Sequence, residues 1–115
     1  MFDPPVVVID DPGGFVAERA AEIGRLLSEG RPVVIAGRCA SACTLYLALD
    51  RVCMTPRAVF QFHAPSDPAL GAIFLRLYPA GIRAWIAAHG GLGARVLTMP
   101  ATEAARHVPL CPQRG

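Results

Sequence analysis

The chain contains no lysine: all eleven of its basic residues are arginines, and they stand against nine acidic residues. A serine–lysine dyad, a Schiff-base lysine and a Walker-type phosphate loop all require a lysine ammonium group, so its absence excludes these three sites. No run of one sign is longer than the pair Asp10-Asp11, and the formal net charge is only +2. The sequence therefore predicts neither a nucleic-acid surface nor a membrane-binding patch.

Long apolar runs are missing as well. Apolar runs such as Val6–Ile9 and Val33–Ala36 are strand-sized, whereas a membrane-spanning helix needs about 20 apolar residues. The segment Met1–Pro5 has neither the basic region nor the apolar region of a secretory signal. The chain as printed thus predicts no membrane span and a cytoplasmic location. A signal lost from the N-terminus would instead predict a periplasmic or exported protein.

The composition is that of a globular domain. Of the 115 residues, 53% are apolar and 17% charged, and the mean hydropathy is +0.40. This composition predicts one domain over residues 1–115 with a single core. The sequence holds no dinucleotide fingerprint, metal-ligand cluster or calcium loop, so we expect no cofactor and no metal.

Strand and helix patterns alternate along the chain. The β-branched runs Val6–Ile9 and Val33–Ala36 predict fully buried strands, and two short extended segments are predicted over 51–55 and 58–62. Helices are predicted over 15–29, 42–50, 69–88 with a break at Tyr78-Pro79, and 101–106. In the first helix the apolar face is expected to hold Val16, Ala20, Ile23 and Leu27. Such alternation is typical of an α/β fold with a mostly parallel sheet.

Three chemically interesting elements each follow a predicted strand: Gly13-Gly14, Ser41 and His63. Functional sites of parallel sheets form at the carboxyl ends of the strands, so we expect the three elements to meet there. Each also has a purely structural interpretation. Ser41 is a good helix N-cap, His63 a possible core histidine, and the glycine pair a simple turn.

Taken together, these elements resemble a known set of sequence blocks. Residues 11–14 (Asp-Pro-Gly-Gly), 37–43 (Gly-Arg-Cys-Ala-Ser-Ala-Cys) and 62–65 (Phe-His-Ala-Pro) are similar, in order and spacing, to three blocks of the Clp protease proteolytic subunit. That family belongs to the crotonase-like superfamily of stacked β-β-α units. The Cys-Ala-Ser-Ala-Cys core is most similar to bacterial Clp-protease-like proteins, many of which are predicted to be exported.

The resemblance implies a fold, a site and a reaction. The fold would be a crotonase-like β-β-α superhelix, shortened at its N-terminus because the family begins with further strands. Ser41 would be the nucleophile and His63 the general base, and the N–H groups of Gly14 and Ala42 would form the oxyanion hole. The implied activity is that of a serine hydrolase, peptidase-like, acting on a peptide or protein substrate. The family forms rings, so a homo-oligomer is also implied.

One departure from the family concerns the third member of its catalytic triad, an aspartate. No aspartate follows Asp67, and Glu103, the only later carboxylate, matches a structural Glu-Ala block of the family. Asp67, Glu103 or a backbone carbonyl would have to orient His63 in its place. The main rival hypothesis is therefore an inactive or weakly active domain that serves in assembly or binding. An acyl-CoA enzyme ranks last, since the chain lacks lysine and suitable carboxylates.

The four cysteines leave several pairings open. Cys39 and Cys43, four residues apart, are more consistent with a structural pair or buried thiols than with a zinc site. Cys39 is also an alternative nucleophile, because a thiolate is intrinsically more reactive than a hydroxyl. In an exported protein, Cys111 could pair with either of them.

Overall fold

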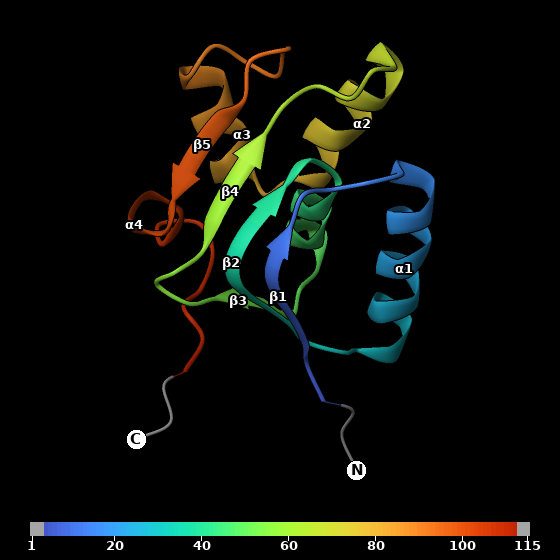
Figure 1. Ribbon diagram of the computed structural model, residues 1–115, viewed down its shortest axis with the longest axis vertical. Coiled ribbons are helices and arrows are strands. Elements are labelled where there is room, and N and C mark those ends of the chain that lie inside the picture. Colours follow the sequence, from blue (N-terminus) through green and yellow to red (C-terminus); the bar gives the residue numbers. More distant parts are fainter. Residues whose placement is uncertain (1–3, 113–115) are drawn as a thin grey trace.

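The computed structural model describes residues 4–112, which form one five-stranded sheet with helices (Figure 1). The elements in chain order are β1 (Val6–Asp11), α1 (Val16–Glu29), β2 (Val33–Ala40), the 3₁₀ helix η1 (Ser41–Ala48), β3 (Val52–Met54), β4 (Val59–Phe62), α2 (Pro68–Leu77), α3 (Ala80–Ala88), β5 (Leu97–Pro100) and α4 (Ala101–Ala104). The mixed α/β character expected from the sequence is thus present. No helix in this part of the chain is long and apolar enough to cross a membrane.

The sheet is parallel around its centre. Its order is β1-β2-β4-β5, with β3 also paired to β2. Strands β1, β3 and β4 run parallel to β2, and only β5 runs antiparallel, to β4. The carboxyl ends of β1, β2 and β4 therefore lie at one edge of the sheet, at the top of Figure 1. This confirms the prediction that the segments after these strands share one edge.

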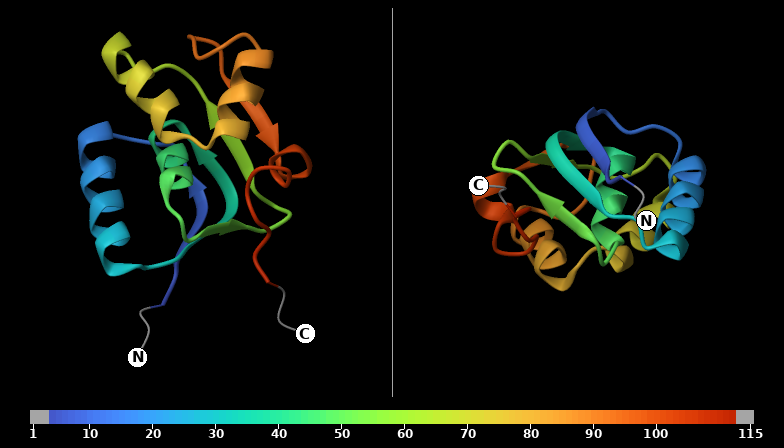
Figure 2. Two further views of the ribbon diagram at one scale, coloured as in Figure 1. Left: turned by 180° about the vertical axis from the view of Figure 1, so that it is seen from behind. Right: turned by 90° about the horizontal axis from the view of Figure 1, so that it is seen from below.

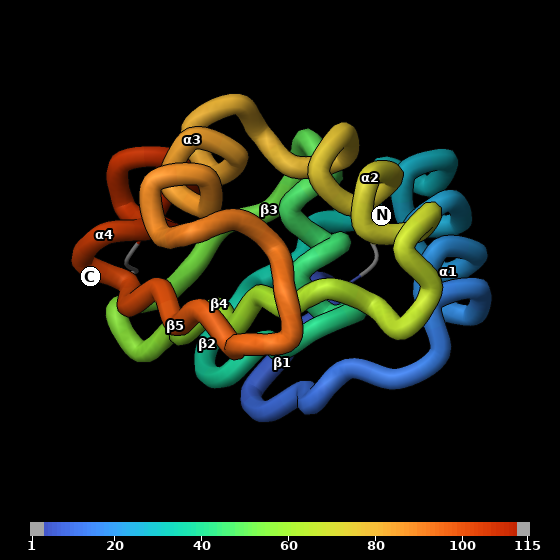
Figure 3. The backbone as a smooth tube through the Cα atoms, turned by 90° about the horizontal axis from the view of Figure 1, so that it is seen from above, coloured from blue at the N-terminus to red at the C-terminus, as the bar shows by residue number. Residues whose placement is uncertain are grey.

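The helices cover only one face of the sheet, as the views from behind and from above show (Figures 2 and 3). Fully buried residues on that face include Val33, Ile35, Phe60 and Phe62. The prediction that the first strand is fully buried is wrong, because Val8 is its only buried residue and Ile9 is 71% exposed. A sheet covered on one side alternates between core and solvent, whereas a fully buried strand needs covers on both faces.

Strand β1 carries an irregularity just before its end. The register with β2 shifts between Val8 and Asp10, so that Asp11 pairs with Cys39. Gly37 lies opposite the shift, where a Cβ atom would overlap the carbonyl oxygen of Ile9. Glycine is thus required at position 37 for the two backbones to approach, and the bulge redirects the chain after Asp11 toward the end of β2.

Helix α1 ends as the sequence predicts, with Gly30 in the left-handed conformation at its C-terminus (φ 65°). Its buried face is rotated from the expected one: Leu26 is fully buried, whereas Leu27 is 57% exposed and Ala20 is also exposed. The predicted break at Tyr78-Pro79 is confirmed, since α2 ends at Leu77 and α3 begins at Ala80.

Three predicted boundaries were wrong. The strand predicted over Val33–Ala36 extends to Ala40, and the helix predicted over 42–50 is the 3₁₀ helix η1. The last predicted helix is shortened to α4. Strand β5 was not predicted at all, because four residues ending in proline give little local signal and their partner, β4, lies far away in sequence.

Candidate functional site

Ser41 lies at the junction of β2 and η1, in a backbone conformation that is unfavourable for serine. Its φ angle is 55°, and no other non-glycine residue among residues 4–112 has a positive φ. Holding a residue other than glycine in this region costs on the order of 1–3 kcal/mol and persists only where the surroundings enforce it. Such a sharp strand-to-helix turn exposes the side chain at the edge of the sheet. Ser41 is half-buried there.

A buried pair of hydroxyl groups holds the Ser41 backbone. The Thr44 Oγ1 atom donates a hydrogen bond to the Ser41 carbonyl oxygen at 2.6 Å and lies 2.6 Å from the Tyr78 hydroxyl. Because the single Thr44 proton is directed at the carbonyl, Tyr78 must donate to Thr44. Thr44 is fully buried, and burial raises the pKa of Tyr78 to about 12. The Tyr78 hydroxyl is therefore a neutral donor at physiological pH.

The glycine loop after β1 lies directly against Ser41. A Cβ atom on Gly13 would lie 2.8 Å from the Ser41 Cβ atom and 3.0 Å from the Ala40 carbonyl oxygen. Gly13 also has a φ angle of 105°, which side chains rarely allow. Glycine at this position thus lets the loop backbone approach the serine.

Two backbone N–H groups of this region are available to a ligand. Gly13 donates its N–H to Asp11 Oδ1 at 2.9 Å, whereas Gly14 donates no hydrogen bond within residues 4–112. Ala42 is the second residue of η1, and the first N–H groups of a helix have no acceptor within it. Gly14 and Ala42, the two residues predicted for the oxyanion hole, therefore each have an N–H group without an acceptor in residues 4–112.

An ion pair that the sequence does not predict anchors the glycine loop. Both oxygens of Asp11 contact the Arg19 guanidinium, at 3.2 Å and 2.9 Å, while Oδ1 also accepts the Gly13 N–H. The central carbon of this guanidinium group, Cζ, lies 5.1 Å from the centre of the Tyr46 ring in η1. An aspartate two residues before a glycine is typical of such a turn, whereas no local signal in the sequence identifies Arg19 as its partner.

His63 follows β4, on the strand next to β2. Ala40, the last residue of β2, pairs with Gln61 in the parallel register, so Ser41 and His63 both follow the carboxyl ends of neighbouring strands. The His63 Nδ1 atom lies 2.9 Å from the Ala64 carbonyl oxygen. When Nδ1 carries a proton it donates to that carbonyl, which leaves Nε2 as the free base. No hydrogen bond joins Ser41 to His63 in residues 4–112.

Neither of the two carboxylates considered as the missing triad acid is bonded to His63. The Asp67 Oδ1 atom accepts the Ala69 N–H at 3.0 Å and caps α2. Glu103 lies in α4, which begins beside Val59 because Pro100 pairs with that residue. His63 follows the opposite end of β4, so Glu103 is remote from it. Of the three alternatives, the structure provides the backbone carbonyl, that of Ala64.

All four cysteines form disulfides. Cys39 pairs with Cys43 across Ser41, as expected for a structural pair, and both residues are fully buried. Cys53 of β3 pairs with Cys111, so the suggested pairing of Cys111 with Cys39 or Cys43 is wrong. The C-terminal segment runs beside β3, where Cys111 donates its N–H to the Met54 carbonyl. A disulfide-bonded Cys39 has no thiolate, which removes it as an alternative nucleophile.

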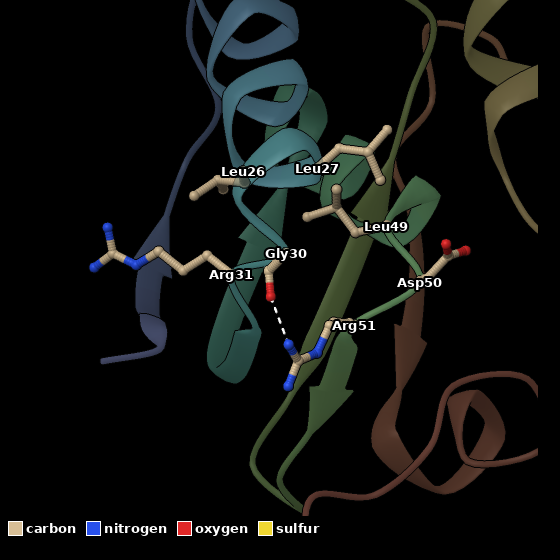
Figure 4. Close-up of a pocket in the computed structure, with 7 residues that line it drawn as sticks. All are labelled: Leu26, Leu27, Gly30, Arg31, Leu49, Asp50 and Arg51. Atoms are coloured by element: carbon tan, nitrogen blue, oxygen red, sulfur yellow. Dashed lines mark hydrogen bonds between the residues drawn. The ribbon is translucent and has the colours of Figure 1, made fainter. Parts of the chain in front are cut away.

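Two hollows in this part of the chain lie away from Ser41. One, of about 90 Å³, lies where α1 ends and β2 begins, at the amino ends of the strands (Figure 4). It is lined by Leu26, Leu27, Gly30, Arg31, Leu49, Asp50 and Arg51, and Arg51 donates to the Gly30 carbonyl oxygen across it. The other, apolar and about 210 Å³, lies beside α4. Both are smaller than the roughly 300 Å³ of typical ligand pockets.

Comparison of the chain with models of known protein families gives no match, and neither does comparison with curated protein sequences.

Proposed function

We propose that the chain is a serine hydrolase of the Clp-protease-like type, within the crotonase-like superfamily, that acts on peptide bonds. The supporting observation is the convergence of three segments at one edge of the sheet. Ser41 is held at positive φ, the Gly13 backbone lies against it, and His63 follows the neighbouring strand. This juxtaposition matches what acyl transfer requires: a nucleophile, a base and backbone donors for a developing oxyanion.

In the proposed reaction, the Ser41 Oγ atom attacks the substrate carbonyl carbon while His63 Nε2 accepts the hydroxyl proton. The carbonyl oxygen becomes an oxyanion, which the N–H groups of Gly14 and Ala42 stabilise. His63 then gives the proton to the leaving amine, and the acyl group stays on Ser41. Water, deprotonated by His63, attacks this ester and releases the acid. Throughout, the Ala64 carbonyl accepts the Nδ1 proton and so keeps the imidazole in the required tautomer.

We further propose that the chain associates with copies of itself. Exposed apolar side chains lie on β1 and the loop after it: Val7, Ile9 and Phe15 are 54%, 71% and 78% exposed. Strand β1 is an edge strand with one unpaired side, which favours association. Light scattering of the purified protein measures the size of any assembly. An assembly without serine reactivity would favour the rival proposal of a non-catalytic domain.

The central experiment is labelling with a fluorophosphonate probe, which forms a covalent bond to the oxygen of an activated serine, read by intact mass. We expect one adduct on the oxidised protein and none on Ser41→Ala. His63→Ala should label at least about 100-fold more slowly, because a general base contributes roughly that much. Ser28→Ala, at an exposed serine of α1, is the matched control and should label at the wild-type rate.

Two further variants examine the missing acid. Asp67→Asn keeps a helix-capping oxygen, and Glu103→Gln keeps the size of the side chain, so both should fold. Since neither carboxylate is bonded to His63, we expect both variants to label within about twofold of wild type. An adduct that survives Ser41→Ala, or no adduct on folded oxidised protein, would contradict the proposed function.

A further inference from the structure

The disulfide between Cys39 and Cys43 encloses Ser41 in a short ring. The two Cα atoms are 5.2 Å apart, whereas four residues of extended chain would span about 13 Å. The chain must therefore reverse direction between the two cysteines. The reversal takes place at Ser41, the non-glycine residue with positive φ, which stands midway between them.

The disulfide joins the two parts of the molecule that define the site. Cys39 belongs to β2, where it pairs with Asp11 of β1 and with Phe60 of β4. Asp11 in turn accepts the N–H of Gly13, the residue that lies against Ser41. Cys43 belongs to η1, one residue after the oxyanion donor Ala42. The bond thus fixes the start of η1 relative to the strand that positions the glycine loop.

The second disulfide has a different place and a different effect. Cys53 and Cys111 are 58 residues apart in sequence and connect β3 to the C-terminal segment, at a distance from Ser41. A disulfide restricts the unfolded chain more when it closes a longer loop, so Cys53–Cys111 stabilises the whole fold more strongly. Cys39–Cys43 closes a separation of only four residues. Its main effect is consequently on the local geometry around Ser41.

We infer that the Cys39–Cys43 disulfide is a positioning element of the Ser41 site, so that the protein is fully reactive only in its oxidised form. This inference rests on the proposed hydrolase function. A dithiol reduces the bond by supplying two electrons and two protons: the S–S bond breaks, two thiols form, and the dithiol becomes a disulfide. Ser41 then keeps the Thr44 hydrogen bond but loses the ring that enforces its positive φ. Such dependence suits an oxidising compartment.

The test compares two double variants with the wild type in fluorophosphonate labelling, measuring the maximal labelling rate and the probe affinity separately. Cys39→Ala/Cys43→Ala retains only the remote disulfide, and Cys53→Ala/Cys111→Ala retains only the one around Ser41. We expect the first to label on the order of 10- to 100-fold more slowly at unchanged probe affinity and unchanged circular dichroism. The second should label at the wild-type rate, although its melting temperature falls.

A redox arm uses the Cys53→Ala/Cys111→Ala protein, in which dithiothreitol can act on Cys39–Cys43 alone. Once thiol titration counts two free thiols, labelling should slow as in the other double variant, and oxidised glutathione should restore it. Equal slowing in both double variants would indicate general destabilisation and overturn the inference, as would wild-type labelling of folded Cys39→Ala/Cys43→Ala. If oxidised wild type forms no Ser41 adduct, the proposed function itself fails, and the inference with it.

Discussion

The two halves of the candidate site are built very differently. On the serine side, the backbone of Ser41 is fixed by a disulfide, by the fully buried Thr44 and by the contact with Gly13. On the histidine side, the half-buried His63 has one hydrogen bond, to the carbonyl of the residue that follows it. The position of the nucleophile is therefore fixed by several contacts from different parts of the fold, whereas the base is held by one local hydrogen bond.

This difference sets an expectation for reactivity. An aspartate that orients the imidazole contributes about 10⁴ in turnover in well-characterised triads. A backbone carbonyl selects the same tautomer but carries no negative charge to stabilise the imidazolium. We therefore expect the serine to react with strongly electrophilic probes more readily than with ordinary amides. Among substitutions that keep both the Ser41 and the His63 side chain, those that disturb the contacts of Ser41 should lower the labelling rate most.

Among single substitutions that keep both the Ser41 and the His63 side chain, the largest effect is predicted for Gly13→Ala. The added Cβ atom would lie 2.8 Å from the Ser41 Cβ atom, and the backbone at φ 105° disfavours any side chain. We expect a loss of about 1–3 kcal/mol in the free energy of unfolding. Because displacement of the nucleophile by about 1 Å costs roughly 100-fold, labelling of Ser41 should fall at least tenfold. Urea denaturation and labelling kinetics measure the two effects.

Gly24→Ala is the matched control for that prediction. Gly24 lies in the middle of α1 and a Cβ atom there would meet nothing within 4 Å. Alanine in a helix is favoured over glycine, so the variant should gain about 0.5–1 kcal/mol and label normally. Wild-type labelling of Gly13→Ala would show that the close approach of the glycine loop is unnecessary for the reaction.

An intermediate effect is predicted for Thr44→Val. Valine has nearly the same shape as threonine but leaves the Ser41 carbonyl and the Tyr78 hydroxyl without this partner. A buried polar group left unsatisfied costs about 1–3 kcal/mol, and labelling should slow severalfold. Thr98→Val, at an exposed position of β5, is the control and should be close to neutral. Equal labelling of the two variants would argue against a role of Thr44 in holding Ser41.

The parts of this fold that the sequence predicts are those with local causes. Gly30 ends α1, Pro79 separates α2 from α3, and the glycine pair and Ser41 follow strands. These signals act within a few residues, and they sufficed to place the candidate site at one edge of the sheet. The resemblance of three short blocks to a known family adds an interpretation of that edge, and this interpretation stays a proposal.

The features that escaped prediction depend on contacts distant in sequence. Strand β5 forms only because β4 offers an edge, and the Cys53–Cys111 pair is set by the path of the C-terminal segment along β3. The ion pair between Arg19 and Asp11 depends on how α1 packs against the loop after β1. The local sequence of η1 is rich in good helix formers, which predicts an α-helix. The segment is a 3₁₀ helix instead, and it begins at the strained Ser41, inside the disulfide ring.

The smallest predicted effect is on the pH dependence of stability, which shows whether water reaches the Tyr78 hydroxyl on the serine side. Burial raises the pKa of Tyr78 to about 12, above the ordinary value of 10.0 that the unfolded chain has. Between these two values the unfolded state loses the tyrosine proton while the folded state keeps it. Stability is therefore fully present below pH 10 and falls as the pH rises toward 12, by about 1.4 kcal/mol per pH unit for this group.

Tyr78→Phe removes this contribution. The variant loses one buried hydrogen bond, to Thr44, which should cost about 1 kcal/mol at pH 9. On going from pH 9 to pH 11, however, it should lose about 1.4 kcal/mol less than the wild type, because phenylalanine cannot ionise. Tyr46, whose pKa burial also raises, is present in both proteins, so its contribution cancels in the comparison. Urea denaturation at the two pH values gives the difference directly. Equal losses in the two proteins would mean that water reaches the Tyr78 hydroxyl, and that the serine side is held less tightly than its contacts indicate.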